Sequence, residues 1–200
     1  FVSLVSMASK SRGLNEWIKA NKGEDYDLAD YPFNQGDIVT TMLKCSNGET
    51  VVLTHDCSLP RNYSRAYRVQ GTKGLYMEDG DSIYIEGRTK NEDGSWMHPS
   101  ESFEPYLKEY EHPLWKKYQT EGVHGGHGGM DWHVLRAWVE TVKNGTLPPI
   151  DVYDMAAWMS ITALSEKSLQ NNGEVLEIPD FTRGKYKNRE PQDETPYTIK

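Results

Sequence analysis

The dipeptide Asn47-Gly48 constrains the fold of this chain more than any other feature. It separates two runs of strand-forming residues, at 36–45 and 49–56, that are rich in Val, Thr and Leu. Asn-Gly between two such runs favours a two-residue turn that joins antiparallel strands. The chain is therefore expected to contain an antiparallel sheet that is built on this hairpin.

The two-residue turn also predicts which residues face each other across the hairpin. Ser46 would lie opposite Glu49, and Ile38 would lie opposite Cys57. In that register Cys45 and Cys57 are far apart and on opposite faces. A disulfide between them is not expected, because a bridge needs the two Cα atoms within about 7 Å.

Both faces of the predicted hairpin carry apolar side chains. One face holds Val39, Leu43, Cys45 and Val52. The other holds Ile38, Met42, Val51 and Leu53. A sheet that is apolar on both faces is usually covered on both. We expect helices on one face and a second domain or a second subunit on the other.

Strand patterns dominate the first half of the chain and helical patterns the second. Further strands are predicted at 1–9, 66–70, 74–78, 82–87 and 174–178, with polar loops at 21–35 and 91–99. Helices are predicted at 11–20, 109–119, 130–144 and 151–170, with Ser11 and Asp151 as N-caps and an interruption at His112-Pro113. This order predicts an α+β fold with an antiparallel or mixed sheet, one domain at 1–184 and an extended tail at 185–200.

Composition limits the classes of partner. The net charge is −8, with 30 acidic and 22 basic residues and no basic stripe, so no nucleic-acid partner is expected. No apolar run approaches about 20 residues, so no membrane span is expected either. The chain opens on Phe1-Val-Ser-Leu-Val-Ser-Met7, which reads as the middle of a strand without an initiator Met. We interpret it as a piece of a longer polypeptide.

The segment at 124–129 holds four glycines and two histidines and leads into the helix predicted from Met130. Glycines let a backbone approach a ligand closely, and the helix offers free N–H groups. His124 and His127 have the spacing of metal ligands, but no third ligand is fixed, although His133 or Asp131 could serve. We expect no metal here. The segment is either a helix entry whose histidines bond locally or a loop that faces a substrate or cofactor.

Other candidate groups are weaker. The connection at 59–65 contains Tyr63, which could donate to a sugar hydroxyl or pack as a surface turn. Asp56, Glu78 and Asp131 are candidate carboxylates, but nothing in the sequence pairs two of them as a standard glycosidase requires. The tryptophans are expected in the core or at an interface, and only Trp96 and Trp132, in or beside loops, could instead stack on a sugar. No dinucleotide fingerprint or P-loop occurs, so this chain cannot build a Rossmann site alone.

Several motifs together resemble one known family. They are Leu59-Pro-Arg-Asn-Tyr-Ser-Arg65, His112-Pro-Leu-Trp115, Gly125-Gly-His-Gly-Gly-Met-Asp131, Asp151-Val-Tyr-Asp154 and Pro179-Asp-Phe-Thr-Arg-Gly184. In this order they resemble the C-terminal domain of glycoside hydrolase family 109, within the Gfo/Idh/MocA oxidoreductase superfamily. The family's characterised activity is that of an α-N-acetylgalactosaminidase. The resemblance covers nearly the whole chain, up to Gly184.

The resemblance implies a two-domain parent. An N-terminal Rossmann domain, absent from this chain, would hold NAD. The present chain would form an open, mainly antiparallel sheet with helices packed on one face, and would serve for substrate binding and oligomerisation. The implied chemistry oxidises the sugar transiently at C3, eliminates the glycosidic oxygen, adds water and reduces the ketone again. Such NAD-dependent enzymes are exceptions to the two-carboxylate rule.

The resemblance also implies where the functional residues lie. The family's catalytic histidine would precede Phe1, so this chain alone is expected to be inactive and to bind no NAD tightly. Tyr63 matches a substrate-site tyrosine, while His127, Asp131 and Arg65 are further substrate-binding candidates. The implied substrate is an N-acetylated or other sugar glycoside. The implied parent is a homo-oligomer that is periplasmic or secreted, with a cytoplasmic location as the alternative. Two alternatives stay open: a sugar dehydrogenase of the same superfamily, or a non-catalytic sugar-binding or dimerisation module.

Overall fold

The structure is a computed structural model that describes residues 1–89, 101–121, 125–188 and 195–198. These residues form two compact units. Unit 1 comprises Phe1–Pro60 and Ala137–Lys200, and unit 2 comprises Arg61–Arg136. Each unit is described by itself below. The predictions made for His124, Trp96 and the loop at 91–99 lie outside the described residues.

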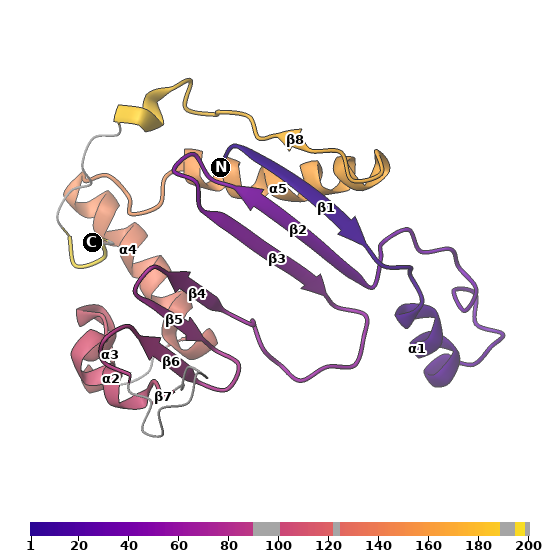
Figure 1. Cartoon of the computed structure of the whole chain (residues 1–200), viewed down its shortest axis with the longest axis horizontal. Helices are drawn as coiled ribbons and strands as arrows, with labels where there is room; N and C mark the ends of the chain where they lie inside the picture. Colours follow the sequence, from indigo (N-terminus) through magenta and orange to yellow (C-terminus); the bar gives the residue numbers. More distant parts are fainter. Residues whose placement is uncertain (90–100, 122–124, 189–194, 199–200) are drawn as a thin grey trace. The chain divides into compact units, whose positions relative to one another are not determined.

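Unit 1 is built on a four-stranded antiparallel sheet (Figure 1). Its strand order is β3 (Thr50–Asp56), β2 (Ile38–Lys44), β1 (Ser3–Ala8) and β8 (Leu176–Glu177). The 19-residue helix α5 (Val152–Gln170) packs on this sheet. The predicted α+β class, open antiparallel sheet and covering helix are confirmed. The described strands are divided over two sheets, of which the second lies in unit 2.

The hairpin between β2 and β3 has a longer turn than predicted. The Cys45 N–H donates to the Glu49 carbonyl at 2.8 Å, and the Gly48 N–H donates to the Cys45 carbonyl at 3.1 Å. Gly48 has a φ of 102°, a conformation that favours glycine. These features define a three-residue loop, a type I turn that ends in a glycine bulge. The predicted two-residue turn is therefore wrong.

The longer turn shifts the register of the hairpin by one residue. Ile38 lies opposite Asp56 instead of Cys57, and Leu43 lies opposite Val51. Residues that face each other in an antiparallel pair share one face of the sheet, so the predicted composition of the two faces is wrong. In the observed register, Cys45 and Cys57 fall at positions that share one face of the hairpin, contrary to the prediction. They still lie at opposite ends of the hairpin, and both are free thiols.

The core of unit 1 lies between the sheet and α5. Leu4 and Leu43 are each 1% exposed and face each other across β1 and β2, and Ile178 joins them. Ile161 and Leu164 of α5 pack against this cluster. The helix thus buries its apolar side chains on one face of the sheet.

Asp151 caps α5 as predicted. Its side chain accepts the backbone N–H groups of Tyr153 and Asp154, and the Asp154 side chain accepts the Asp151 N–H in return. This reciprocal pairing satisfies backbone donors that the first turn of a helix otherwise leaves free.

Buried hydroxyl groups also join α5 to the sheet. Ser168 Oγ accepts the Ser6 N–H at 3.0 Å and donates to the Glu174 carbonyl at 2.7 Å. Thr41 Oγ1 lies 2.8 Å from Ser6 Oγ and 3.0 Å from Ser165 Oγ. All four hydroxyl side chains belong to buried residues. Small polar residues thus let the helix approach the strands while their polar groups stay paired.

The other face of the unit 1 sheet is exposed. Met7 is 76% exposed, Met42 49% and Val52 57%. In the observed register, these three residues lie on the face of the sheet opposite to Leu4 and Leu43. The helix expected on one face is therefore observed, whereas the second domain or subunit expected on the other face stays a prediction.

The first helix is capped from a distance. α1 (Gly13–Lys22) has no capping side chain at its own N-terminus, so the predicted Ser11 cap is wrong. The buried carboxylate of Asp37 instead accepts the Arg12 N–H at 2.9 Å and the Gly13 N–H at 2.9 Å. This bond between residues about two dozen positions apart fixes α1 to the start of β2.

Unit 2 holds the second antiparallel sheet and two short helices. The strands, in sheet order, are β4 (Arg68–Gly71), β5 (Gly74–Met77), β6 (Ser82–Ile85) and β7 (Glu101–Ser102). The helix predicted at 109–119 is observed as α2 (Glu104–Tyr110) and α3 (Pro113–Glu121). The predicted interruption at His112-Pro113 is confirmed, because Pro113 cannot continue α2. α4 (Met130–Asn144) has the predicted bounds and contains the division between the units.

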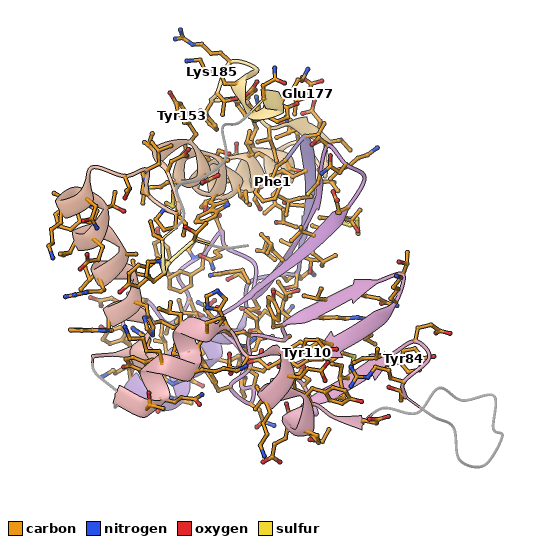
Figure 2. All side chains as sticks on the ribbon, turned by 90° about the vertical axis from the view of Figure 1, so that its left-hand side faces the viewer. Phe1, Tyr84, Tyr110, Tyr153, Glu177 and Lys185 are labelled. Carbon is orange, nitrogen blue, oxygen red and sulfur yellow. The ribbon has the colours of Figure 1, made fainter. Side chains whose placement is uncertain are left out.

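Arg88 forms hydrogen bonds to the C-terminal end of α2 in unit 2. Its guanidinium donates to both carboxylate oxygens of Glu109, at 3.2 and 3.1 Å, and to the Tyr110 hydroxyl at 2.6 Å. Figure 2 shows Tyr110 on this helix. The hydrogen bonds from Arg88 lower the pKa of Glu109. Because these groups are exposed, water screens the pair and it adds modest stability.

No helix in the described part of the chain is long and apolar enough to cross a membrane.

The hydroxyl network of α5 yields a stability prediction. Ser168→Ala should lower the free energy of unfolding by about 1 to 3 kcal/mol, because the buried Ser6 N–H would lose its acceptor. Ser160→Ala on the same helix, where the hydroxyl bonds only the Ala157 carbonyl, should change it by less than about 0.5 kcal/mol. Urea unfolding measures both. Equal losses would contradict the structural role assigned to Ser168.

Candidate functional site

The glycine-rich segment forms a tight turn at the start of α4 in unit 2. His127, Gly128 and Gly129 have φ values of 51°, 64° and 99°, and they form the 3₁₀ turn η1 (His127–Gly129). Three successive positive φ values are costly for residues with a Cβ. The glycines therefore serve the backbone path itself, and His127 is the residue of the three that carries a side chain in a strained backbone conformation.

His127 pairs with Asp131 at the end of this turn. Its Nδ1 lies 2.9 Å from Asp131 Oδ2, and the side chains are 71% and 53% exposed. Asp131 lies in the first turn of α4, where a negative charge is favoured by the helix dipole. A carboxylate at Nδ1 fixes the tautomer of a neutral imidazole and leaves Nε2 as a hydrogen-bond acceptor. The pair can thus accept a proton or a hydrogen bond from a bound molecule.

An aromatic cluster supports the turn from within unit 2. Trp115, Tyr118 and His133 make mutual edge contacts, with ring centroids 4.5 to 5.7 Å apart. Tyr118 is 3% exposed and touches Gly129, where any Cβ would enter its ring. Both nitrogens of His133 are buried without a hydrogen-bond partner among the described residues. An imidazole N–H facing a ring gains a weak contact in place of a hydrogen bond.

The sequence did not predict this supporting role for Tyr118 or His133. It allowed His133 as a third metal ligand, yet the ring packs between Trp115 and Tyr118. Within the described ranges, no group of three His, Cys, Asp or Glu side chains is placed to hold a metal ion. His133 lies in α4, whereas Trp115 and Tyr118 lie in α3. No sequence pattern predicts this contact between two helices.

Tyr63 and Arg65 lie in the loop that precedes β4. Ser64 fixes this loop: its hydroxyl donates to Asp79 Oδ1 at 2.5 Å and accepts the Ala66 N–H at 2.7 Å. Tyr63 is 83% exposed, and Arg65 is also exposed. The loop is therefore anchored at Ser64, and the two candidate side chains on either side of it are accessible to a ligand.

The candidate residues form two groups in unit 2. One is the His127–Asp131 pair and the other is the loop with Tyr63 and Arg65. In the part of the chain that the structure describes, no hydrogen bond or ring contact joins the side chains of the two groups. Their common role in substrate binding stays a prediction. Glu78 has a structural role, because its carboxylate accepts the Tyr67 N–H at 3.0 Å.

Unit 1 contains a pocket of about 990 Å³ beside the N-terminus of α5. Four of its lining residues are labelled in Figure 2: Phe1, Tyr153, Glu177 and Lys185. Asp180 shapes one wall, because its carboxylate accepts the Thr182 hydroxyl and the backbone N–H groups of Thr182 and Gly184. The bond from the Thr182 hydroxyl, with those from the backbone, lowers the pKa of Asp180.

The comparison with known families identifies the class of protein. Residues 1–188 match the family model described as "Glycosyl hydrolase 109, C-terminal domain". The chain therefore belongs to this family, as its motifs predicted.

Three relatives show how far this similarity extends. A "Glycosyl hydrolase family 109 protein" of Stenotrophomonas maltophilia is 48% identical over 192 residues, and one of Parabacteroides distasonis is 44% identical over 192 residues. An "Alpha-N-acetylgalactosaminidase" of Tannerella forsythia is 43% identical over 191 residues. Each alignment covers 96% of this chain but only 40 to 41% of the relative. The chain thus spans about two fifths of the length of these relatives.

The turn before α4 yields a second prediction. Gly129→Ala should lower the free energy of unfolding by about 3 kcal/mol or more, because the new Cβ would enter the Tyr118 ring at a positive φ. Gly128→Ala is the matched control: its φ is also positive, but no atom lies within 4 Å of the new Cβ, so a loss of about 1 kcal/mol is expected. Near-ultraviolet circular dichroism and urea unfolding measure the effects. A tolerated Gly129→Ala would contradict the packing described.

Proposed function

We propose that this chain is the substrate-side domain of an NAD-dependent glycosidase that cleaves α-N-acetylgalactosaminides. The observation that carries the proposal is the 43% identity, over 96% of the chain, to a protein named alpha-N-acetylgalactosaminidase. The family match over residues 1–188 supports the same class. A periplasmic or secreted parent is part of the proposal.

We propose that the described residues form no Rossmann-type site for NAD. Both sheets are antiparallel, and the glycine-rich turn follows α3 in the chain, whereas a dinucleotide site needs a glycine-rich turn between a parallel strand and a helix. We therefore place NAD, which supplies a two-electron oxidant when bound, in a part of the parent outside these 200 residues. The residues of this chain then contribute to binding and orienting the sugar.

Tyr63 and Arg65 are proposed to bind the sugar. The Tyr63 phenol can donate a hydrogen bond to a hydroxyl or to the acetamido carbonyl, and it is accessible. The Arg65 guanidinium presents several donors to the same kind of oxygen. The anchoring of the loop at Ser64 limits the conformational entropy that the loop loses when the sugar binds.

The His127–Asp131 pair is proposed to orient the substrate through His127 Nε2. With Nδ1 held by Asp131, Nε2 of the neutral ring accepts a hydrogen bond from a sugar hydroxyl or from the acetamido N–H. The hydrogen bond to Asp131 restrains the direction of the ring. The turn and the aromatic cluster beneath it thus hold one polar contact in a defined position.

The substrate role of Tyr63 is tested in the full-length protein. Tyr63→Phe should lower kcat/KM on an aryl α-N-acetylgalactosaminide by about 10- to 100-fold, because a hydrogen bond to the substrate is lost. Tyr67→Phe, at an exposed tyrosine four residues along, should leave kcat/KM unchanged. Aryl release is followed by absorbance, with the 200-residue chain alone as a blank that should release nothing.

The same assay separates the proposed activity from its alternative. A glycosidase that recycles its cofactor releases the aryl group without net formation of NADH. Accumulation of NADH with a free sugar, and no aryl release, would instead support a sugar dehydrogenase of the same superfamily. An unchanged kcat/KM in Tyr63→Phe would remove Tyr63 from the site and leave the reaction class intact.

We further propose that the exposed face of the unit 1 sheet forms a homo-oligomer contact. Val52→Glu places a charge among Met7 and Met42 and should convert the oligomer to a monomer, because burial of an unpaired charge is costly. Val69→Glu, at a similarly exposed valine of β4, should leave the oligomer intact. Light scattering of the full-length protein measures the mass. A wild-type monomer, or an oligomer unaffected by Val52→Glu, would contradict this contact.

A further inference from the structure

A thiol, an imidazole and an amide lie together at the end of β3 in unit 1. Cys57 Sγ is 3.3 Å from His55 Nε2, and His55 Nδ1 is 3.3 Å from Gln35 Nε2. All three residues are exposed. A thiol that contacts an imidazole, with the imidazole oriented by a third group, is an arrangement found at reactive cysteines.

The backbone holds these residues in place. His55 lies in β3 and Cys57 follows the end of this strand, and the 3.3 Å contact shows that their side chains lie together. Gln35 precedes Gly36, which packs so closely on the Ser9 carbonyl that a Cβ there would clash. The next residue, Asp37, is anchored by its hydrogen bonds to α1. The amide of Gln35 is therefore presented to His55 by a fixed segment.

The hydrogen bonds assign the proton on His55. An amide nitrogen can only donate, so His55 Nδ1 is the acceptor of the Gln35 N–H. The neutral imidazole then carries its proton on Nε2, and this N–H points at the sulfur of Cys57. When Cys57 reacts as a thiolate, which is the nucleophilic form, this N–H is placed to donate a hydrogen bond to its sulfur.

We propose that Cys57 is a reactive thiol that forms a reversible mixed disulfide with a low-molecular-weight disulfide. The Cys57 thiolate attacks one sulfur of the disulfide. A new S–S bond forms to Cys57, the original S–S bond breaks, and the other half leaves as a thiolate. Two electrons move within the exchange, so no further oxidant is needed. A second thiol restores Cys57 by the reverse reaction.

Cys45 does not compete for this adduct. It is partly buried and lies at the other end of the hairpin from Cys57, so the two cysteines cannot form a disulfide with each other. Cys45 therefore cannot resolve the mixed disulfide, which an external thiol can remove. This inference is independent of the proposed glycosidase activity, because it uses neither the substrate nor the cofactor.

The test measures the rate at which Cys57 reacts with the neutral disulfide 4,4′-dithiodipyridine at neutral pH. The full-length protein is compared with a peptide of residues 53–59, which contains His55 and Cys57 but lacks Gln35 and the fixed strand. Cys57 of the folded protein should react about ten-fold faster than the peptide. Mass spectrometry of the digest should place the first adduct on Cys57, and dithiothreitol should remove it.

Variants distinguish activation of the Cys57 thiol by His55 from reactivity that arises only because Cys57 is exposed to solvent. Cys57→Ser should abolish the fast phase and Cys45→Ser should retain it. His55→Ala should slow Cys57 to about the rate of the peptide, whereas Thr54→Ala, at an exposed neighbour on β3, should not. The proposal is overturned if folded Cys57 reacts no faster than the peptide, or if His55→Ala leaves the rate unchanged.

Discussion

The contact between α5 and the strands β1 and β2 is the interaction on which unit 1 depends. Leu4 and Leu43 supply the apolar part of this contact, and the hydroxyls of Ser6 and Ser168 supply the polar part. Leaving the buried Ser6 N–H without an acceptor would cost more free energy than the hydrogen bond itself contributes. The helix must therefore pack with Ser168 beside Ser6. The polar pair therefore fixes where the helix lies along the sheet, while the apolar pair makes the docking favourable.

In unit 2 the corresponding constraint is the backbone path before α4. Three successive positive φ values bring the chain onto the ring of buried Tyr118, and glycine is needed where the backbone touches that ring. The same path ends with His127 beside Asp131. A structural demand for glycines and the pair proposed to bind substrate thus share one segment. This explains why the sequence alone left open whether the segment was a helix entry or a binding loop, since it serves as the former and is proposed as the latter.

The sequence predicted those elements whose signals are local. The bounds of α4 were correct and Asp151 caps α5, because periodicity and caps act within a few residues. The predicted pairing of the hairpin strands was displaced by one residue from the observed pairing. The reason is that Asn47-Gly48 fits both a two-residue turn and a three-residue turn with a glycine bulge. The cap of α1 was missed because Asp37 is distant in the sequence. In the candidate site, likewise, the i, i+4 spacing of His127 and Asp131 allowed their pairing, whereas the packing of His133 on two residues of another helix left no trace in the sequence.

The exposure of the candidate residues argues that the proposed site is completed by another surface. Tyr63 is 83% exposed and His127 71%. In water at such exposure, a hydrogen bond to a sugar competes with solvent and discriminates weakly between substrates. Polar contacts gain strength and selectivity when water is excluded. Relatives of this chain are about two and a half times its length, which leaves ample polypeptide to provide that exclusion. We therefore expect the specificity of the full-length protein to arise where its remaining part covers these two side chains.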